Sequence, residues 1–338
     1  MPPEQGQPRQ EAQRGASVAF SGGTPEPPGK SGRILVGTCS WTDQTLVKES
    51  DFYPRRSMRA EERLRYYASI FPVVEADAPY YYPPTEEMAG LWVNRTPAGF
   101  TMNIKAYSLF TNHPTRPDSL WPEVAEEVPM EHREKRSVYL SHLPEAAVDE
   151  SWELFRRALM PLHSAGKLGV VLFQFPPWFR PNPDNRAYLK TLQGRLPDYD
   201  LAVEFRHPSW LVEERRGRTL GLLEKEGLSY VCVDEPQGFD SSVPPVVAAT
   251  ADIAVVRFHG RNAETWEEKW ISAAERFAYD YTDDELAEWV PGIRELAATS
   301  RETHALMNNC YRDYAVNNGR QLAALLDEGL QPDAMKEL

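Results

Sequence analysis

The sequence predicts an α/β fold: a single closed TIM (β/α)8 barrel with a disordered N-terminal tail and an insertion after the third strand. From residue 33 onward, eight short runs rich in β-branched or aromatic residues alternate with longer stretches of helical period. Strands that alternate with helices form parallel sheets, and a count of eight favours closure into a barrel. The length of 338 residues is sufficient for such a barrel as one domain.

The strand and helix candidates follow from local pattern. Apolar residues at spacings of three and four predict a helix over 148–162, and Gly166 is placed to end it. Thr282 and Glu285 form a capping box before an apolar face over 286–296. The strands are expected at 33–38, 72–77, 100–105, 169–175, 200–206, 228–234, 253–259 and 304–308.

Two segments lie outside this alternation. Residues 1–32 contain six prolines and six glycines and almost no large apolar side chain, so they cannot build a core and are expected to be a disordered tail. The barrel domain is then 33–338. Residues 107–143, rich in proline, histidine and charge, are too long for an ordinary loop and are interpreted as an insertion over the barrel mouth.

Composition limits the function classes. The chain has 37 Lys and Arg against 50 Asp and Glu, a net charge of −13, which disfavours nucleic acid or an anionic membrane as the main partner. No apolar run approaches a membrane span and no signal peptide is visible at the start, so the expected location is the cytoplasm. Cys39, Cys232 and Cys310 are far apart, which indicates neither a disulfide scaffold nor a zinc knuckle.

Polar side chains gather at the carboxyl ends of the predicted strands. Because residues two apart share a face of a strand, the polar members are expected to point into the barrel while the apolar ones face the helices. Seven strands repeating this pattern indicate a polar site at the C-terminal face. The inward set is Glu75, Asp77, Asn103, Lys105, Gln174, Glu204, Arg206, Asp234, Arg257, His259 and Asn308.

The inward set divides by chemistry. Lys105, Arg206 and Arg257 are cations suited to a phosphate or carboxylate group of a substrate. The candidate catalytic residues for proton transfer are Glu75, Glu204, Asp234 and His259. Asp77, Gln174, His207 and Asn308 complete the polar binding set, and the carboxylates and histidines could also hold a divalent metal, although no metal ligands are assigned. An internal ion-pair network is the open alternative.

Aromatic residues follow several of the same strands. The candidates to stack on a sugar face or a base beside the polar site are Trp41, Tyr80, Tyr81, Tyr82, Trp178 and Trp210. Packing of loops against the barrel rim is the alternative for each. Cys39 has no visible base partner and is a weak candidate nucleophile.

The ordered blocks GTCSW (37–41), VEADAPYYYPP (74–84), LFQFPPWF (172–179), AVEFRHPSW (202–210) and VRFHGRN (256–262) resemble the YecE-like family, bacterial proteins of unknown function. The resemblance covers nearly all of 33–338 and implies a TIM barrel but no established reaction. A repair-like role has been suggested for such proteins by analogy with metal-dependent barrel nucleases. This chain departs from the family pattern at Cys39, Ser40, Asp77, Pro79 and Tyr80.

We therefore expect an enzyme that binds a small polar anionic substrate, phosphorylated, carboxylated or nucleotide-derived, and acts as a hydrolase or lyase. One alternative is a metal-dependent nuclease or phosphodiesterase that uses Glu75, Glu204, Asp234, His207 and His259. The other is a ligand-binding protein without turnover. Metal occupancy would separate these hypotheses, and the oligomeric state is left open.

Overall fold

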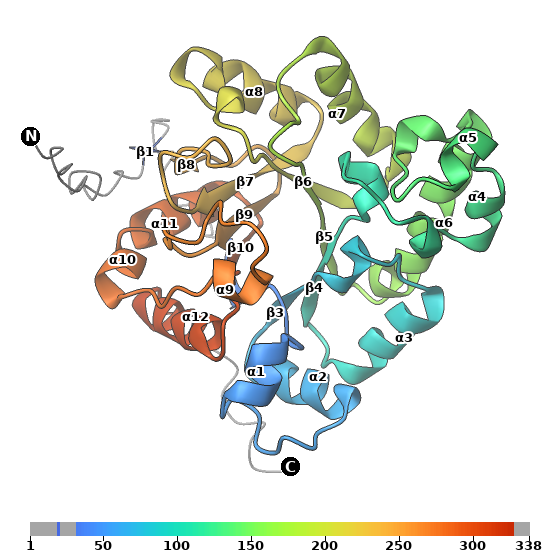
Figure 1. The fold of residues 1–338 in the computed structure, drawn as a ribbon. Coiled ribbons are helices and arrows are strands. Elements are labelled where there is room, and N and C mark those ends of the chain that lie inside the picture. Colours follow the sequence, from blue (N-terminus) through green and yellow to red (C-terminus); the bar gives the residue numbers. More distant parts are fainter. Residues whose placement is uncertain (1–18, 21–31, 328–338) are drawn as a thin grey trace, which may run out of the picture.

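The computed structural model describes residues 19–20 and 32–327, and within them eight parallel strands close into a barrel (Figure 1). Neighbours around the barrel follow the order β10, β2, β3, β4, β5, β6, β7, β9. The predicted TIM-barrel fold is confirmed, and the expected strands agree with the observed ones to within two residues. These are β2 (Arg33–Thr38), β3 (Val73–Ala76), β4 (Thr101–Lys105), β5 (Leu168–Gln174), β6 (Asp200–Glu204), β7 (Leu228–Asp234), β9 (Ile253–Phe258) and β10 (Glu302–Met307).

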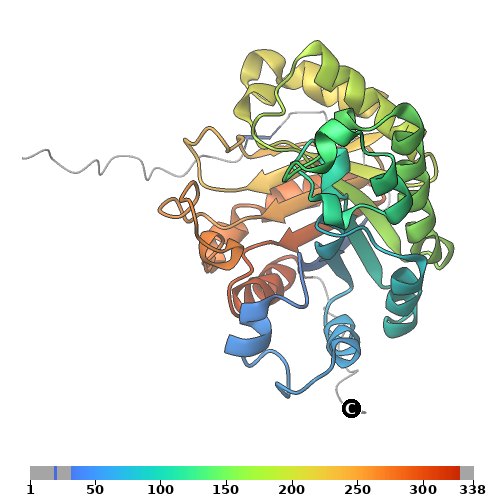
Figure 2. The ribbon, with the colours of Figure 1, turned by 45° about the vertical axis from the view of Figure 1, so that its right-hand side comes forward.

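Helices surround the strands (Figure 1, Figure 2). The longer ones are α2 (Ala60–Ala68), α3 (Glu86–Arg95), α6 (Glu145–Ser164), α7 (Pro183–Arg195), α8 (Glu213–Lys225), α11 (Val290–Thr299) and α12 (Tyr314–Leu325). Short helices α1 (Gln44–Glu49), α9 (Ala273–Arg276) and α10 (Asp283–Ala287) lie in the connections, with 3₁₀ turns η1 (Ala78–Tyr80) and η5 (Pro208–Trp210). None of the described helices combines the length and apolar character needed to span a membrane.

The helix predictions hold with one exception. The apolar face over 148–162 lies within α6, and Gly166 follows it with a φ of +62°, a conformation that favours glycine. The Thr282 and Glu285 capping box begins α10 as expected. The helix does not continue to 296, because the chain ends α10 and starts α11 next to Pro291, which cannot donate a helical hydrogen bond.

Two further expectations need qualification. Within the predicted tail, Ala19–Phe20 form β1, which pairs in parallel with β8 (Val246–Val247); the rest of 1–31 lies outside the described residues. The insertion contains η2 (Ser108–Thr111), η3 (Pro117–Ser119), α4 (Pro122–Glu126), α5 (Met130–Arg133) and η4 (Leu140–His142). Its Phe110 stacks on Trp152 of α6 at 3.9 Å between ring centroids. Most of the insertion therefore covers α6 rather than the barrel mouth (Figure 1).

Strand register determines which side chains enter the barrel. Glu75 pairs with Asn103, Gln174 with Glu204, and Arg257 with both Val233 and Leu306. Residues that pair across a parallel ladder point to the same side of the sheet. The carboxyl ends of β3, β4, β5, β6 and β9 thus present their polar residues inward, as the sequence predicted.

Candidate functional site

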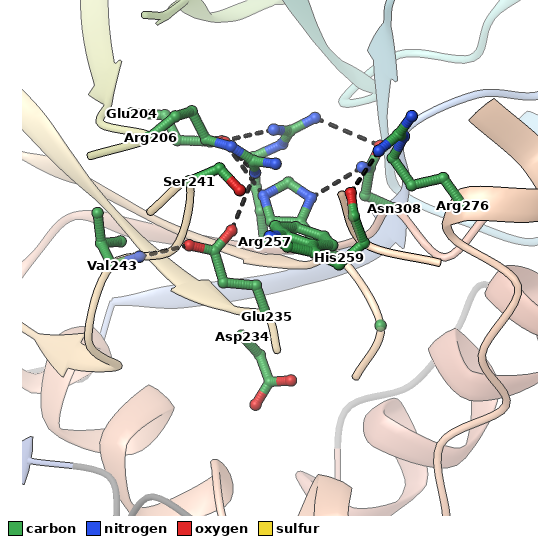
Figure 3. Close-up of polar contacts among 12 residues, drawn as sticks. Glu204, Arg206, Asp234, Glu235, Ser241, Val243, Arg257, His259, Arg276 and Asn308 are labelled. Atoms are coloured by element: carbon green, nitrogen blue, oxygen red, sulfur yellow. Dashed lines mark hydrogen bonds and ion pairs between the residues drawn. The ribbon is translucent and has the colours of Figure 1, made fainter. Parts of the chain in front are cut away.

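The centre of the candidate site is the guanidinium group of Arg257 on β9. Only 1% of the surface of this residue is exposed. Its Nη2 donates to Oε1 of Glu75 on β3 at 2.7 Å, and its Nη1 donates to Oε2 of Glu204 on β6. No two of these three strands are hydrogen-bonded neighbours. Arg257 therefore ties three separate parts of the barrel together through its interior. Figure 3 shows Arg257 among Glu204, Arg206 and His259.

Glu204 has two further partners. Its Oε1 accepts hydrogen bonds from Nη1 of Arg206 at 3.2 Å and from Nε2 of His259 at 3.1 Å. The other ring nitrogen of His259 accepts from the side-chain amide of Asn308 at 2.8 Å, which assigns the proton to Nε2. Burial, only partly opposed by the Glu204 carboxylate, lowers the pKa of His259 to about 3. His259 is thus a neutral donor near pH 7.

One guanidinium group faces two buried carboxyl groups, and these differ in protonation. Burial opposes the charge of Glu204, but its partners, chiefly Arg257, hold its pKa well below the ordinary value. Burial raises the pKa of Glu75 because Arg257 does not offset it, and the nearby Glu204 charge raises it further. Oε2 of Glu75 is buried without a hydrogen-bond partner in the described part of the chain. We infer that Glu204 is ionised and that Glu75 retains its proton.

Glu235, which the sequence analysis did not select, belongs to the same site (Figure 3). Its Oε2 lies 3.0 Å from Nη1 of Arg206, and its Oε1 accepts from the backbone amide of Val243 at 2.7 Å. Burial raises the pKa of Glu235 to about 8 in spite of this ion pair. The Arg206 guanidinium also lies over the ring of Trp266, 4.8 Å from its centroid. Arg206 is therefore held by two carboxyl groups and one indole ring.

Asp234 is a correction to the expected site. Val233 pairs with Arg257 and faces inward, so Asp234 faces the helices, and it points away from the cluster in Figure 3. Its carboxylate accepts hydrogen bonds from Arg261, Tyr281 and Trp289. Side chains two apart share a face of a strand, so an inward Val233 implies an inward Glu235, the residue just beyond the strand.

Lys105, at the end of β4, is the cation of the site that keeps a free amine. It is partly buried and forms no ion pair or hydrogen bond with any described residue; its Nζ lies 4.5 Å from the ring centroid of Tyr80. Burial lowers the pKa of Lys105, and Arg257 lowers it further, while Glu75 and Asp77 oppose the shift. Ala76 pairs with Ile104 at the ends of β3 and β4. Asp77 and Lys105, the next residue on each chain, therefore lie at neighbouring strand ends.

Aromatic rings form a rim beside Lys105. Tyr80 contacts Tyr81 and His113 edge to face at 5.0 Å and 5.2 Å, and His113 contacts Trp178 at 5.8 Å. Tyr81 and Trp178 are more than half exposed. Burial lowers the pKa of His113 to about 3. We call Tyr80, Tyr81, His113 and Trp178 the aromatic rim. Tyr80, Tyr81 and Trp178 are among the aromatic residues that the sequence places after strands, whereas His113 reaches the rim through the insertion, which no local pattern indicates.

Several other selected residues do not join the cluster. Trp210 is fully buried between Phe205 and Phe179, and its indole nitrogen donates to a backbone carbonyl; Trp41 is buried against Trp92 of α3. Both tryptophans are packing residues, which was the alternative stated for them.

His207 bonds Ser209 at the rim of the fold. Gln174 faces inward beside Glu204. Asn103 lies deeper in the barrel and accepts from the backbone of Val170. Burial raises the pKa of Cys39, although Arg257 lies 3.6 Å from its sulfur, so the thiol stays protonated.

The residues suggested for a metal site are not brought together. Glu75 and Glu204 are bound to arginine, Asp234 lies on the other side of its strand, and His207 is turned to Ser209. In the portion of the chain that the structure describes, no group of three or more His, Cys, Asp and Glu residues could hold a metal ion. The donor set therefore does not fit a metal at this site.

The fold and the cluster define a (β/α)8 barrel whose ionisable groups gather at the carboxyl ends of its strands, where barrel enzymes place their active sites. The chain belongs to the family described as "Protein of unknown function DUF72", whose model matches residues 35–337. This agrees with the resemblance found from sequence.

The similarity to known relatives extends over nearly the whole barrel. The UPF0759 protein YunF of Bacillus subtilis is 32% identical over 308 residues, which cover 88% of this chain and 98% of that protein. A DUF72 family protein of Enterococcus faecalis V583 superposes with a TM-score of 0.71 at 26% identity, covering 88% of this chain and 96% of its own. A DUF72 family protein of Thermotoga maritima MSB8 gives 0.67 at 30% identity, covering 88% and 100%.

The unequal protonation of the two carboxyl groups can be tested by amide substitution. We expect Glu204→Gln to lower the free energy of unfolding by about 3–5 kcal/mol, since two arginines lose their carboxylate. Glu75→Gln replaces a neutral acid with a neutral amide and should cost less than about 1 kcal/mol. Urea unfolding near neutral pH measures both. Equal losses, or a larger loss for Glu75→Gln, would contradict the assignment.

Glu235 predicts a pH effect on stability. The folded protein keeps this proton up to about pH 8, whereas a glutamic acid of the unfolded chain loses it near about pH 4.3. Stability therefore falls as the pH rises between these values, by up to about 1.4 kcal/mol per unit. Glu235→Gln should remove this contribution in urea unfolding between about pH 5 and pH 8.

The control for this experiment is Glu224→Gln on α8, an exposed position that should leave the pH slope of the wild type unchanged. If the curves of Glu235→Gln and the wild type run parallel over the same pH interval, Glu235 does not hold its proton in the folded state.

Proposed function

We propose that this protein is an enzyme that binds a small polar substrate at the carboxyl end of the barrel and transfers protons with carboxyl groups. One observation carries the proposal: Glu75 and Lys105 lie on the neighbouring strands β3 and β4, and both have polar atoms without a hydrogen-bond partner in the described residues. Oε2 of Glu75 is fully buried, and buried polar groups without partners are rare in proteins and commonly await a ligand or water.

The surrounding groups give these two residues distinct roles. Burial raises the pKa of Glu75 and so favours its acid form, and a carboxylic acid can donate a proton to a substrate oxygen. Glu204 serves instead as a fixed negative charge, since its oxygens are held by Arg257, Arg206 and His259. Acid chemistry of this kind is common to hydrolases and lyases, the two classes we infer.

The substrate's polar end is assigned to Lys105. The sequence analysis expected three cations to bind an anion, but Arg257 and Arg206 are occupied by internal carboxyl groups. A single carboxylate or carbonyl oxygen at Lys105 fits better than a multiply charged group such as a phosphate. The aromatic rim stands beside it and offers apolar surface to the rest of a small molecule.

A metal-dependent nuclease gains no support from the geometry, because its suggested ligands are dispersed or bound to arginine. A binding protein without turnover uses the same residues as the proposed enzyme. The two differ in whether the bound compound is changed and in whether Glu75 is needed for that change.

The proposal predicts that the purified protein binds a small polar compound through Lys105. Native mass spectrometry of protein taken directly from cells should reveal a retained ligand, and thermal shift with hydroxy acids, keto acids and sugar phosphates should find compounds that raise the melting temperature. Lys105→Met should weaken binding by about tenfold or more, the typical loss of a charge-assisted hydrogen bond.

The matched control is Lys225→Met on α8, an exposed lysine whose loss should leave binding unchanged. Equal binding by Lys105→Met and the wild type would overturn the site. A ligand that binds through Lys105 but is recovered unchanged, with the same affinity in Glu75→Gln, would identify a binding protein instead of an enzyme.

A further inference from the structure

Two lysines in the barrel have lowered pKa values but opposite surroundings. Lys167, just before β5, is 8% exposed and its Nζ donates to the carbonyl oxygens of Val93 at 2.8 Å and Thr96 at 2.6 Å, and to the Thr96 hydroxyl at 3.0 Å. These three bonds use every proton of its ammonium group. Lys105 makes no such bond with any described residue. Lys167 is therefore structural, whereas the nitrogen of Lys105 is uncommitted.

The groups that face Lys105 come from several elements. Burial and Arg257 on β9 favour the neutral form of Lys105. Glu75 on β3, Asp77 after β3 and Glu204 on β6 oppose it, and so does the Tyr80 ring through its cation–π contact. His113 is close enough for Lys105 to lower its pKa. A lysine that is desolvated beside another cation is a recognised form of amine nucleophile. Lys105 has this arrangement at the carboxyl end of the barrel.

We propose that Lys105 is an amine nucleophile that forms an imine with the carbonyl group of a small polar aldehyde, ketone or keto acid. This inference rests on the proposed function and makes it more specific, since it names the functional group that the substrate carries. Three observations support it: the uncommitted Nζ, its place among the inward residues of the strand ends, and acids on the adjacent strand end.

The chemistry balances with the groups present. The lone pair of the neutral amine attacks the carbonyl carbon, the C–N bond forms, and the carbonyl π electrons move to oxygen, which takes a proton. A carboxylic acid then donates a proton to the hydroxyl group of the resulting carbinolamine, which leaves as water. The nitrogen gives up its remaining proton as the C=N bond of the imine forms. Burial raises the pKa of both Glu75 and Asp77, so each is a suitable donor. Amine and carbonyl compound thus give imine and water, with no oxidant or reductant.

The test is reductive trapping with glyoxylate, a small anionic aldehyde, and cyanoborohydride, which adds hydride to the imine carbon. Near neutral pH, peptide mapping should find Lys105 modified at least about tenfold faster than the exposed Lys48, Lys190 and Lys225. The advantage should shrink as the pH rises toward the ordinary lysine pKa, about 10.4. Lys167 is the internal control and should remain unmodified. Modification of Lys105 no faster than the exposed lysines would overturn the proposal.

A second variant separates this inference from the proposed function. Lys105→Arg retains a positive charge but cannot form an imine. Lys105→Met has no positive charge and cannot form an imine either. If Lys105 resists trapping and Lys105→Arg binds glyoxylate as tightly as the wild type, the imine is refuted and the polar site stands. If Lys105 is trapped in wild type and Lys105→Arg fails in turnover, the imine is supported.

Discussion

The guanidinium group of Arg257 is the element on which the candidate site depends. It lies in the barrel interior between two carboxyl groups on strands that are not neighbours, so it both joins the strands and limits the charge they can carry. One positive charge cannot stabilise two buried carboxylates, and the additional partners of Glu204 decide which of them ionises. Glu75 lacks these additional partners, and we therefore infer that it keeps its proton.

The same constraint explains why the site does not bind anions through its arginines. Arg257 and Arg206 both contact the ionised carboxylate of Glu204, and such buried ion pairs are costly to open. Lys105 stands outside this network although it belongs to the adjacent strand end. The chemistry available to a substrate is therefore one amine, one protonated acid and an apolar rim. The barrel fold alone implies none of this, because barrels support many reactions.

Sequence reasoning recovered the fold and the inward faces of most strands because the two-residue period is a strict geometric rule. It failed at Asp234, because β7 is buried along its whole length and the inward residue, Glu235, lies just past the end of the strand. It left Trp210 open between stacking on a ligand and packing, because exposure is set by tertiary packing, and the structure buries this ring. His113 reaches the rim through a long insertion whose course local pattern does not determine.

Site-resolved carboxyl protonation is the most direct test of the central claim. Protein labelled with carbon-13 at the glutamate side-chain carboxyl carbons would be titrated by NMR, with the signals of the two residues assigned by comparison with Glu75→Gln and Glu204→Gln. We predict that the Glu204 signal stays ionised below its ordinary range, while the Glu75 signal remains protonated above it. Ionisation of both groups together in the ordinary range, or in the reverse order, would contradict the account.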